Sequence, residues 1–403
     1  MAQTKRRRGK RRRADATLRG RDIVCFANDW DGDPLSKTHL MRLLARDNRI
    51  LWVNSLGNRA PRASTHDLRR MATKVLAAVR GVREVEKNIH VLAPVALPLF
   101  ASEAARSFNR AVLTLQVRRA MGSLGFSRPI VWSFLPAAEW VARSLDPELL
   151  IYHCVDEFSA FSDAPAEAVA ETEARLVREA DLVITSAQKL YEAKRLLNPR
   201  TVLVRHGVDY AHFSKALSAK TVVPGDLAGL PKPVLGFFGL LADWVDQELI
   251  EEVARAFPRG SVVLLGRVRT DVSRLRRVPN IHLLGPRPYA TLPAYAKGFD
   301  VALMPFRVNE LTLNANPLKV REYLAAGLPV VSTAVPEVVR LGLCLIARDG
   351  ASAVEQVRKA LRSPGPRRWR SEKIRDESWE ARLEEIRGHV RALRAARAGA
   401  KAG

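Results

Sequence analysis

The chain has 403 residues, a formal net charge of +24 at pH 7, and a composition that is 47% hydrophobic, 27% charged and 6% aromatic. This length favours two domains of about 100–200 residues each, and this composition excludes a disordered or fibrous protein. The three cysteines lie far apart inside apolar runs, so we expect neither a zinc site nor a disulfide. Because no apolar run approaches the roughly 20 residues of a membrane span and no secretory signal is present, we expect a cytoplasmic protein.

Much of the positive charge lies near the N-terminus, where residues 5–13 include two runs of three arginines. So many like charges cannot fold alone, and residues 1–20 are expected to form a disordered basic tail. Such a tail can remain solvated, or it can hold the protein peripherally on the anionic inner face of the plasma membrane. Nucleic acid is the less favoured partner, because no nucleic-acid-binding motif accompanies the basic run.

The first half of the chain alternates short apolar runs with helical patterns. Residues 22–27 and 49–54 are apolar, and between them Leu40, Leu43 and Leu44 recur at helical spacing. The same alternation continues at residues 88–93, 129–134, 149–155, 181–186 and 201–204. Strands that alternate with helices predict a parallel α/β sheet, so residues 21–223 are expected to form one doubly wound, Rossmann-like domain.

A second set of strand patterns follows a linker rich in proline and glycine at residues 224–233. The apolar runs lie at residues 233–239, 261–266, 280–284, 300–304 and 328–332, with a helix expected at 248–257. We therefore expect a second doubly wound domain over residues 234–365. Residues 366–403 contain a helical pattern at 372–396, which we expect to pack back on the first domain. Two such domains would face each other across a cleft.

The segment that begins at Asn316 and Pro317 is typical of an anion site at a helix start. Proline suits the first helical position, so Leu318 and Lys319 would lie in the first turn, where unpaired N–H groups point outward. Glu322 follows one turn later and would face the same cleft. The alternative is an ordinary surface helix on which Lys319 and Glu322 form an i,i+3 ion pair.

The residues 300–307 and 316–331 together resemble the donor-site signature of GT-B glycosyltransferases of the group 1 type. The resemblance is closest to the bacterial branch that includes the teichuronic acid TuaH-like enzymes. Segments 205–213, 236–246, 280–285 and 378–379 agree in the same order, so the resemblance covers roughly residues 22–390. It implies the GT-B fold, a nucleotide-diphosphate sugar as donor, and ribose binding by Glu322.

The donor site is expected to include residues outside the helix start, because glycines at the end of a strand permit close approach of the backbone to a phosphate. Gly239 and Asp243 lie in the loop after the first strand of the second domain, and Arg267 follows the next strand and would reach the diphosphate. A solvated loop position is the alternative for Arg267. One departure is Asn314, which stands where retaining relatives carry a sugar-binding glutamate, so the stereochemical outcome stays open. The predicted donor-binding set is Gly239, Asp243, Arg267, Asn314, Asn316, Leu318, Lys319 and Glu322.

On the acceptor side, the run at residues 152–157 ends a strand on the carboxylates Asp156 and Glu157. Asp156 is the candidate base for the acceptor hydroxyl in an inverting transfer, and an acidic loop that caps the next helix is the alternative. His206 is a lesser candidate catalytic residue, because a lone histidine is more often structural.

The sequence thus predicts transfer of a sugar from a nucleotide donor to a lipid-linked or polysaccharide acceptor in bacterial cell-surface polysaccharide biosynthesis. We expect neither cofactor nor metal, because no Asp-x-Asp motif follows a strand at the donor site and Lys319 with the helix start can hold the diphosphate. One alternative is an epimerase or phosphorylase on the same fold. The other is a protein that binds anions or nucleic acid without catalysis.

Overall fold

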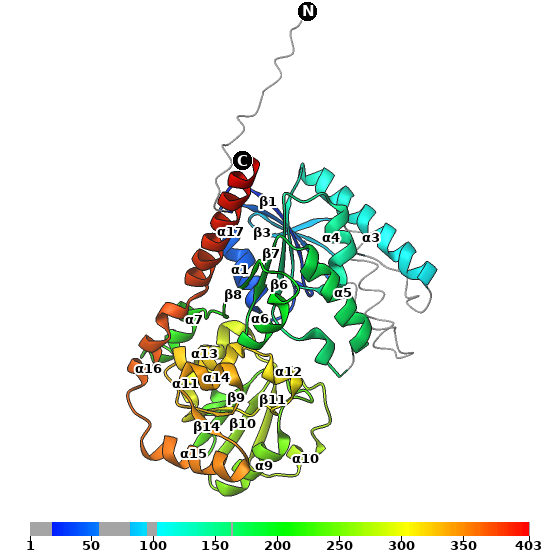
Figure 1. Cartoon of the computed structure of the whole chain (residues 1–403). Coiled ribbons are helices and arrows are strands. Elements are labelled where there is room, and N and C mark those ends of the chain that lie inside the picture. The colour runs from blue at the N-terminus through cyan, green and yellow to red at the C-terminus, as the bar shows by residue number, and fades with distance from the viewer. Residues whose placement is uncertain (1–17, 56–80, 95–102, 163, 403) are drawn as a thin grey trace, which may run out of the picture.

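The computed structural model describes residues 18–55, 81–94, 103–162 and 164–402. The basic tail at residues 5–13, on which the membrane prediction rests, lies outside this part of the chain. The described residues form two α/β domains, each built on its own sheet (Figure 1). No helix within these ranges is long and apolar enough to cross a bilayer.

The first domain contains an eight-stranded sheet in the order β3-β4-β2-β1-β5-β6-β7-β8. Neighbouring strands are parallel, except that β3 and β4 pair in the antiparallel sense. The strands are β1 (Asp22–Phe26), β2 (Arg49–Val53), β3 (Arg83–Glu86), β4 (Ile89–Leu92), β5 (Ile130–Ser133), β6 (Leu149–Cys154), β7 (Leu182–Thr185) and β8 (Thr201–Leu203).

Both faces of this sheet are covered, because successive side chains of a strand point to opposite faces. In β1, Ile23 and Cys25 belong to the apolar core on one face, whereas Val24 and Phe26 belong to the core on the other. Helices α1 (Ser36–Leu44) and α17 (Trp379–Ala402) contribute to the first core. The second core includes α3 (Glu103–Leu124), α4 (Glu139–Ser144), α5 (Ala166–Glu179) and α6 (Gln188–Arg195).

The second domain contains a parallel six-stranded sheet in the order β11-β10-β9-β12-β13-β14. Its strands are β9 (Val234–Phe238), β10 (Ser261–Leu265), β11 (Ile281–Gly285), β12 (Val301–Met304), β13 (Val330–Thr333) and β14 (Leu345–Ala347). Its helices are α9 (Gln247–Ala256), α10 (Ser273–Arg276), α11 (Leu292–Gly298), α12 (Glu310–Leu313), α13 (Leu318–Ala325), α14 (Pro336–Leu341) and α15 (Gly350–Arg362). Short helices α7 (Tyr210–Phe213) and α8 (Gly225–Ala228) lie between the two sheets in the sequence.

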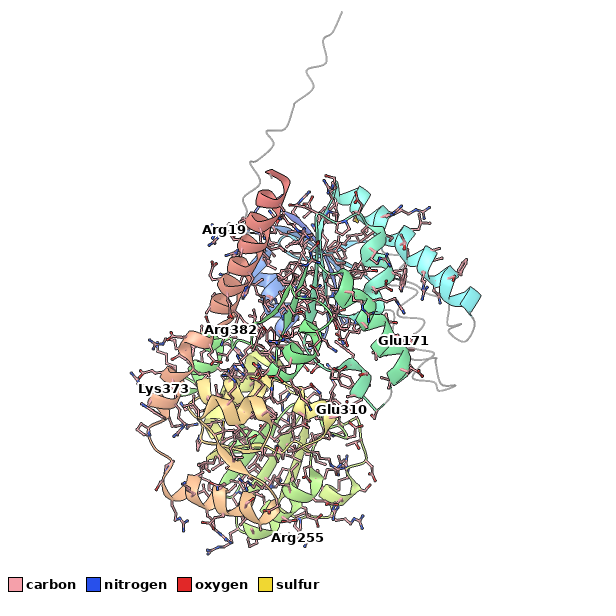
Figure 2. The ribbon with its side chains drawn as sticks, viewed as in Figure 1. Arg19, Glu171, Arg255, Glu310, Lys373 and Arg382 are labelled. Carbon is pink, nitrogen blue, oxygen red and sulfur yellow. The ribbon has the colours of Figure 1, made fainter. Side chains whose placement is uncertain are left out.

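The C-terminal segment returns from the second domain to the first. After α16 (Arg367–Lys373), residues Val208 and Ser378 form a parallel bridge, and α17 then packs against α1. Figure 2 shows Arg382 of α17 near the junction and Arg255 at the far end of the second domain. The chain therefore crosses between the domains twice.

Each apolar run that the sequence predicts as a strand forms one, with ends that agree within two residues. Strands β3 and β14 are additional. The predicted terminal helix at residues 372–396 was wrong at its start, because α17 begins at Trp379. The Ser378 hydroxyl accepts a hydrogen bond from the Ala381 N–H at 3.2 Å and so caps the helix there.

Candidate functional site

Helix α13 begins where the second domain meets the first. Pro317 is its N-cap and Leu318 its first residue, so the proline lies one position earlier than the sequence suggested. No side chain caps this helix, which leaves its first-turn N–H groups available to an anion. Lys319 is the second residue and therefore adds its charge to the positive end of the helix dipole.

The Lys319 side chain extends over the carboxyl end of β9. A Cβ atom built on Gly239 would overlap Lys319 Cε and would lie 2.9 Å from Nζ. Gly239 has a φ of +144°, and a Cβ on Gly266 would overlap the Gly239 carbonyl oxygen. Glycine at these two positions therefore lets the ends of β9 and β10 pack closely beneath Lys319.

Glu322 lies one turn after Lys319 and is partly buried. Burial raises the pKa of its carboxyl to about 7, with the positive charge of Lys319 acting in the opposite direction. The Tyr289 hydroxyl interacts electrostatically with Glu322 and is buried without a hydrogen-bond partner. No sequence motif pointed to this tyrosine. With a pKa near neutrality, the carboxyl group can accept hydrogen bonds from ligand hydroxyls when it is ionised, and it can also donate one when it is protonated.

Asp156 belongs to the first domain, two residues after β6, and lies near Lys319 of the second domain. Burial raises the pKa of its carboxyl to about 6, whereas the positive charges of Lys37 and Lys319 lower it. The influence of Lys319 shows that groups of both domains come together here. A carboxylate with this pKa is ionised at neutral pH and can accept a proton.

Lys37 is a further charged residue of this region that the sequence reasoning missed. It is the second residue of α1, it is 7% exposed, and its Nζ donates a hydrogen bond to Asn28 Oδ1. Burial lowers the pKa of its ammonium group to about 8, while the charge of Asp156 raises it. A signal was present, because Lys37 holds the same position in α1 that Lys319 holds in α13.

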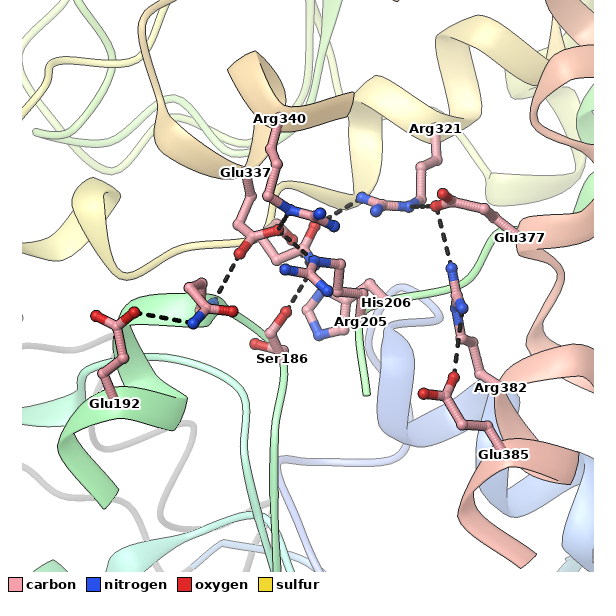
Figure 3. A network of polar contacts seen from close by, with 12 residues as sticks. Ser186, Glu192, Arg205, His206, Arg321, Glu337, Arg340, Glu377, Arg382 and Glu385 are labelled. Atoms are coloured by element: carbon pink, nitrogen blue, oxygen red, sulfur yellow. Dashed lines mark hydrogen bonds and ion pairs between the residues drawn. The ribbon is translucent and has the colours of Figure 1, made fainter. Parts of the chain in front are cut away.

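His206 lies in the contact between the domains (Figure 3). Asn316 and Leu318 of the second domain also contact the first domain. The Asn316 amide donates to the Ser186 carbonyl at 2.7 Å and accepts from Arg321 Nη1 at 2.6 Å. His206 Nδ1 donates to the Asn316 carbonyl at 2.8 Å, and burial lowers the pKa of the imidazole to about 3. Leu318 packs on the core of the first domain. Catalysis by His206 and ligand binding by Asn316 and Leu318 stay predictions.

Glu337 of α14 forms a second connection between the domains in Figure 3. Its carboxylate accepts from Arg205 Nε and from the Gln188 backbone N–H, both at 2.7 Å. It is 4% exposed. The sequence could not reveal this contact, because the first-domain partners are more than a hundred residues away and carry no shared motif.

The remaining predicted donor residues lie outside this set of contacts. Asn314 is buried at the end of α12, where its Nδ2 donates to the Glu310 carbonyl at 2.8 Å. Asp243 is exposed in the turn before α9, which Asp246 caps instead. Arg267 is exposed after β10. No interaction described for these three side chains reaches Lys319 or Glu322.

The site thus combines two lysines with the carboxyl groups of Asp156 and Glu322. Within the described ranges, no group of three histidine, cysteine, aspartate or glutamate side chains is arranged to hold a metal ion. The lysines and the α13 N–H groups can bind an anion. A proton acceptor beside an anion site is the arrangement needed to deprotonate a hydroxyl while an anionic leaving group departs.

Comparison with protein families identifies the domain that carries this helix. Residues 232–363 match the model described as "Glycosyl transferases group 1". The chain is also 29% identical over 225 residues to TuaH of Bacillus subtilis (strain 168), a protein named for glycosyl transfer in teichuronic acid biosynthesis. That match covers 52% of this chain and 56% of TuaH, so the chain spans little more than half of the curated relative's length.

Solved structures share the whole two-domain architecture. Sucrose-phosphate synthase from Thermosynechococcus elongatus superposes with a TM-score of 0.68 at 16% identity, covering 93% of this chain and all of the other. The trehalose-6-phosphate structure from E. coli, bound with UDP-2-fluoro glucose, has a TM-score of 0.63 at 12% identity and covers 92% and 99%. HepE of Anabaena, in complex with UDP and glucose, has a TM-score of 0.58 at 14% identity and covers 95% and 100%. The chain has the GT-B fold, and the part of its second domain that matches the group 1 model is residues 232–363.

Proposed function

We propose that this protein is a glycosyltransferase that moves a sugar from a nucleotide-diphosphate sugar to a lipid-linked or polysaccharide acceptor in the assembly of a bacterial cell-surface polysaccharide. The observation that carries the proposal is the position of Lys319 at the start of α13, within the group 1 domain and electrostatically coupled to Asp156 of the first domain. The names of the relatives support it: TuaH for the type of polymer, and HepE and the E. coli protein for a UDP-linked donor.

In the proposed reaction, the acceptor hydroxyl oxygen attacks the anomeric carbon of the donor sugar while the bond from that carbon to the diphosphate breaks. Asp156 receives the hydroxyl proton. The diphosphate leaves with its electron pair, and Lys319 with the α13 N–H groups stabilises the charge that develops. Glu322 binds the ribose hydroxyls.

We further propose that the transfer inverts the anomeric configuration. Asn314 supplies a neutral amide where retaining relatives carry a carboxylate, and its amide nitrogen is held by the Glu310 carbonyl. Asp156 is then the group that activates the acceptor. Because two lysines and a helix start can neutralise the leaving group, the reaction requires no metal ion. Peripheral attachment to an anionic membrane would bring the enzyme to a lipid-linked acceptor.

The proposal is tested by incubating the full chain with a panel of radiolabelled nucleotide sugars and a bacterial lipid and polysaccharide extract, with EDTA present. We expect label in the lipid or polymer fraction and release of free nucleoside diphosphate. An epimerase would instead return an altered nucleotide sugar, and a phosphorylase would release a sugar phosphate from the polysaccharide when inorganic phosphate is added. A protein that only binds anions would give no labelled product.

A further inference from the structure

Two helices with the same unusual start meet at the junction of the domains. Helix α1 begins with Ser36 and Lys37, and α13 begins with Leu318 and Lys319, so each carries a lysine as its second residue. In neither helix does the N-cap side chain accept a hydrogen bond from a first-turn N–H group. At the start of α1, Thr38 Oγ1 accepts only from the N–H of Leu35, the residue before the helix, at 3.4 Å. Each start therefore presents partial positive charge together with a full cation.

Lys37 is buried without a carboxylate partner at ion-pair distance. Its side chain is 7% exposed, and its one described hydrogen bond is to the neutral amide oxygen of Asn28. Among the ion pairs found in the described part of the chain, none includes Lys37. Burying an ammonium group is costly unless an anion compensates it, and the low pKa of Lys37, about 8, reflects that cost.

Lys37 and Lys319 both lie close enough to Asp156 to affect its carboxyl group electrostatically. Asp156 interacts electrostatically with Lys37 of its own domain and with Lys319 of the other. The loop between β1 and α1 also approaches α13, since Asp33 of that loop interacts with Lys319. His206, which contacts the chain just before α13, senses the charge of Lys37 and has its Nε2 buried without a partner.

The loops that follow β9 and β10 supply no second buried cation beside Lys319, and the buried Arg321 of α13 pairs with Glu377 and Asn316. The loop from Gly239 to Asp246 contains two aspartates and no lysine or arginine. Arg267, the basic residue after the next strand, is exposed. A nucleoside diphosphate carries two to three negative charges near neutral pH, whereas Lys319 supplies one positive charge.

We infer that Lys37 of the first domain and Lys319 of the second together bind the diphosphate of the nucleotide-sugar donor, so that the donor is held by both domains. This inference rests on the proposed function and adds to it the residue that supplies the second charge. Its consequence is that donor binding opposes separation of the domains, because the ligand bridges α1 and α13.

The test compares wild type with Lys37→Met and Lys319→Met in the full chain, using calorimetry with inorganic pyrophosphate, UDP and uridine as probes. Methionine keeps the length of the side chain and removes a buried charge, so Lys37→Met should fold with an unchanged or higher melting temperature. Lys37→Gln provides a second neutral variant. Lys189→Met, which removes an exposed lysine on α6, is the matched control.

We expect each of Lys37→Met and Lys319→Met to weaken pyrophosphate and UDP binding by about tenfold to a hundredfold, the range of a charge-assisted contact. Uridine binding and the Lys189→Met control should not change. Unchanged diphosphate affinity in folded Lys37→Met, or a rise only in the acceptor KM, overturns the inference. If wild type still transfers sugar in that case, the proposed function stands. Wild type that binds neither pyrophosphate nor UDP and transfers no sugar overturns both.

Discussion

The side chain of Lys319 lies across Gly239, and the space that a Cβ atom would need at Gly239 is occupied by Lys319 Cε. The strand end of β9 and the helix start of α13 are therefore fitted to each other through one glycine. Tyr323 of the same helix strengthens this contact, because its hydroxyl accepts a hydrogen bond from the Phe238 N–H at 2.9 Å.

We predict that Gly239→Ala displaces Lys319 and weakens donor binding by about tenfold or more. The φ of +144° adds backbone strain of about 1–3 kcal/mol to the folded state of this variant. The free energy of unfolding and the affinity for UDP measure these two effects separately. A matched control is Gly285→Ala, since Gly285 also has a positive φ but no atom lies within 4 Å of its Cβ position. Equal donor affinity in both variants would contradict the role given to the Lys319 contact.

We predict that Asp156→Asn lowers the rate of transfer by about a hundredfold to ten-thousandfold and preserves donor affinity, because the base acts on the acceptor hydroxyl. The pKa of Asp156 is about 6, and the base must be ionised. Activity should therefore be low below that pH and rise with pH through it. Lys37 lowers this pKa, so the acidic limb should move to higher pH in Lys37→Met. A profile that falls through pH 6 as pH rises would exclude Asp156 as the base.

We predict that Glu337→Gln loosens the two domains. The variant loses the charge that pairs with Arg205 at 2.7 Å in a buried position, and breaking such a pair costs about 3–5 kcal/mol. Differential scanning calorimetry should show a lower melting temperature, with a first transition separating from the second. The exposed pair between Arg362 and Glu355 offers the control, because Glu355→Gln should change stability by at most about 1 kcal/mol. Identical melting curves for both variants would contradict the proposed connection.

The architecture followed from the sequence wherever burial imposed an apolar pattern. The runs of β1, β6 and β10 are buried along almost their whole length, so their hydrophobicity alone predicts parallel strands covered on both faces. Strand β3 was missed because its four residues, Arg83–Glu86, form a polar edge that leaves no such signal. Strand β14 has three residues, which is too short for a pattern.

The site followed from the sequence less completely. Lys319 and Glu322 belong to one helix, and their spacing was enough to bring them together. The position of Lys37 in the first turn of α1 was a signal, but its place beside Lys319 depends on the approach of α1 to α13, and those helices are almost three hundred residues apart. Asn316 carries the expected motif, but the fold uses its side-chain amide to connect the domains. Contacts between distant segments depend on tertiary structure, which residue spacing does not encode.

We predict that the N-terminal basic block binds the full chain reversibly to anionic membranes. Each lysine or arginine near an anionic surface contributes about 1 kcal/mol of binding free energy, so several of them would suffice for reversible binding. Salt would weaken this attraction. Co-sedimentation with phosphatidylglycerol vesicles should exceed that with phosphatidylcholine vesicles, and it should fall at high salt. A chain that starts at Arg21 is the control. Equal sedimentation of both chains with both vesicles would leave the block as a solvated extension.

The most direct measurement of the central claim is the stoichiometry of products in the presence of EDTA. Wild type is expected to release one free nucleoside diphosphate for each sugar that appears in the acceptor, and Lys319→Met should lose most of this activity while retaining its fold. Lys189→Met should behave as wild type. Sugar transfer that proceeds equally well in Lys319→Met, or product without free nucleoside diphosphate, would contradict the account.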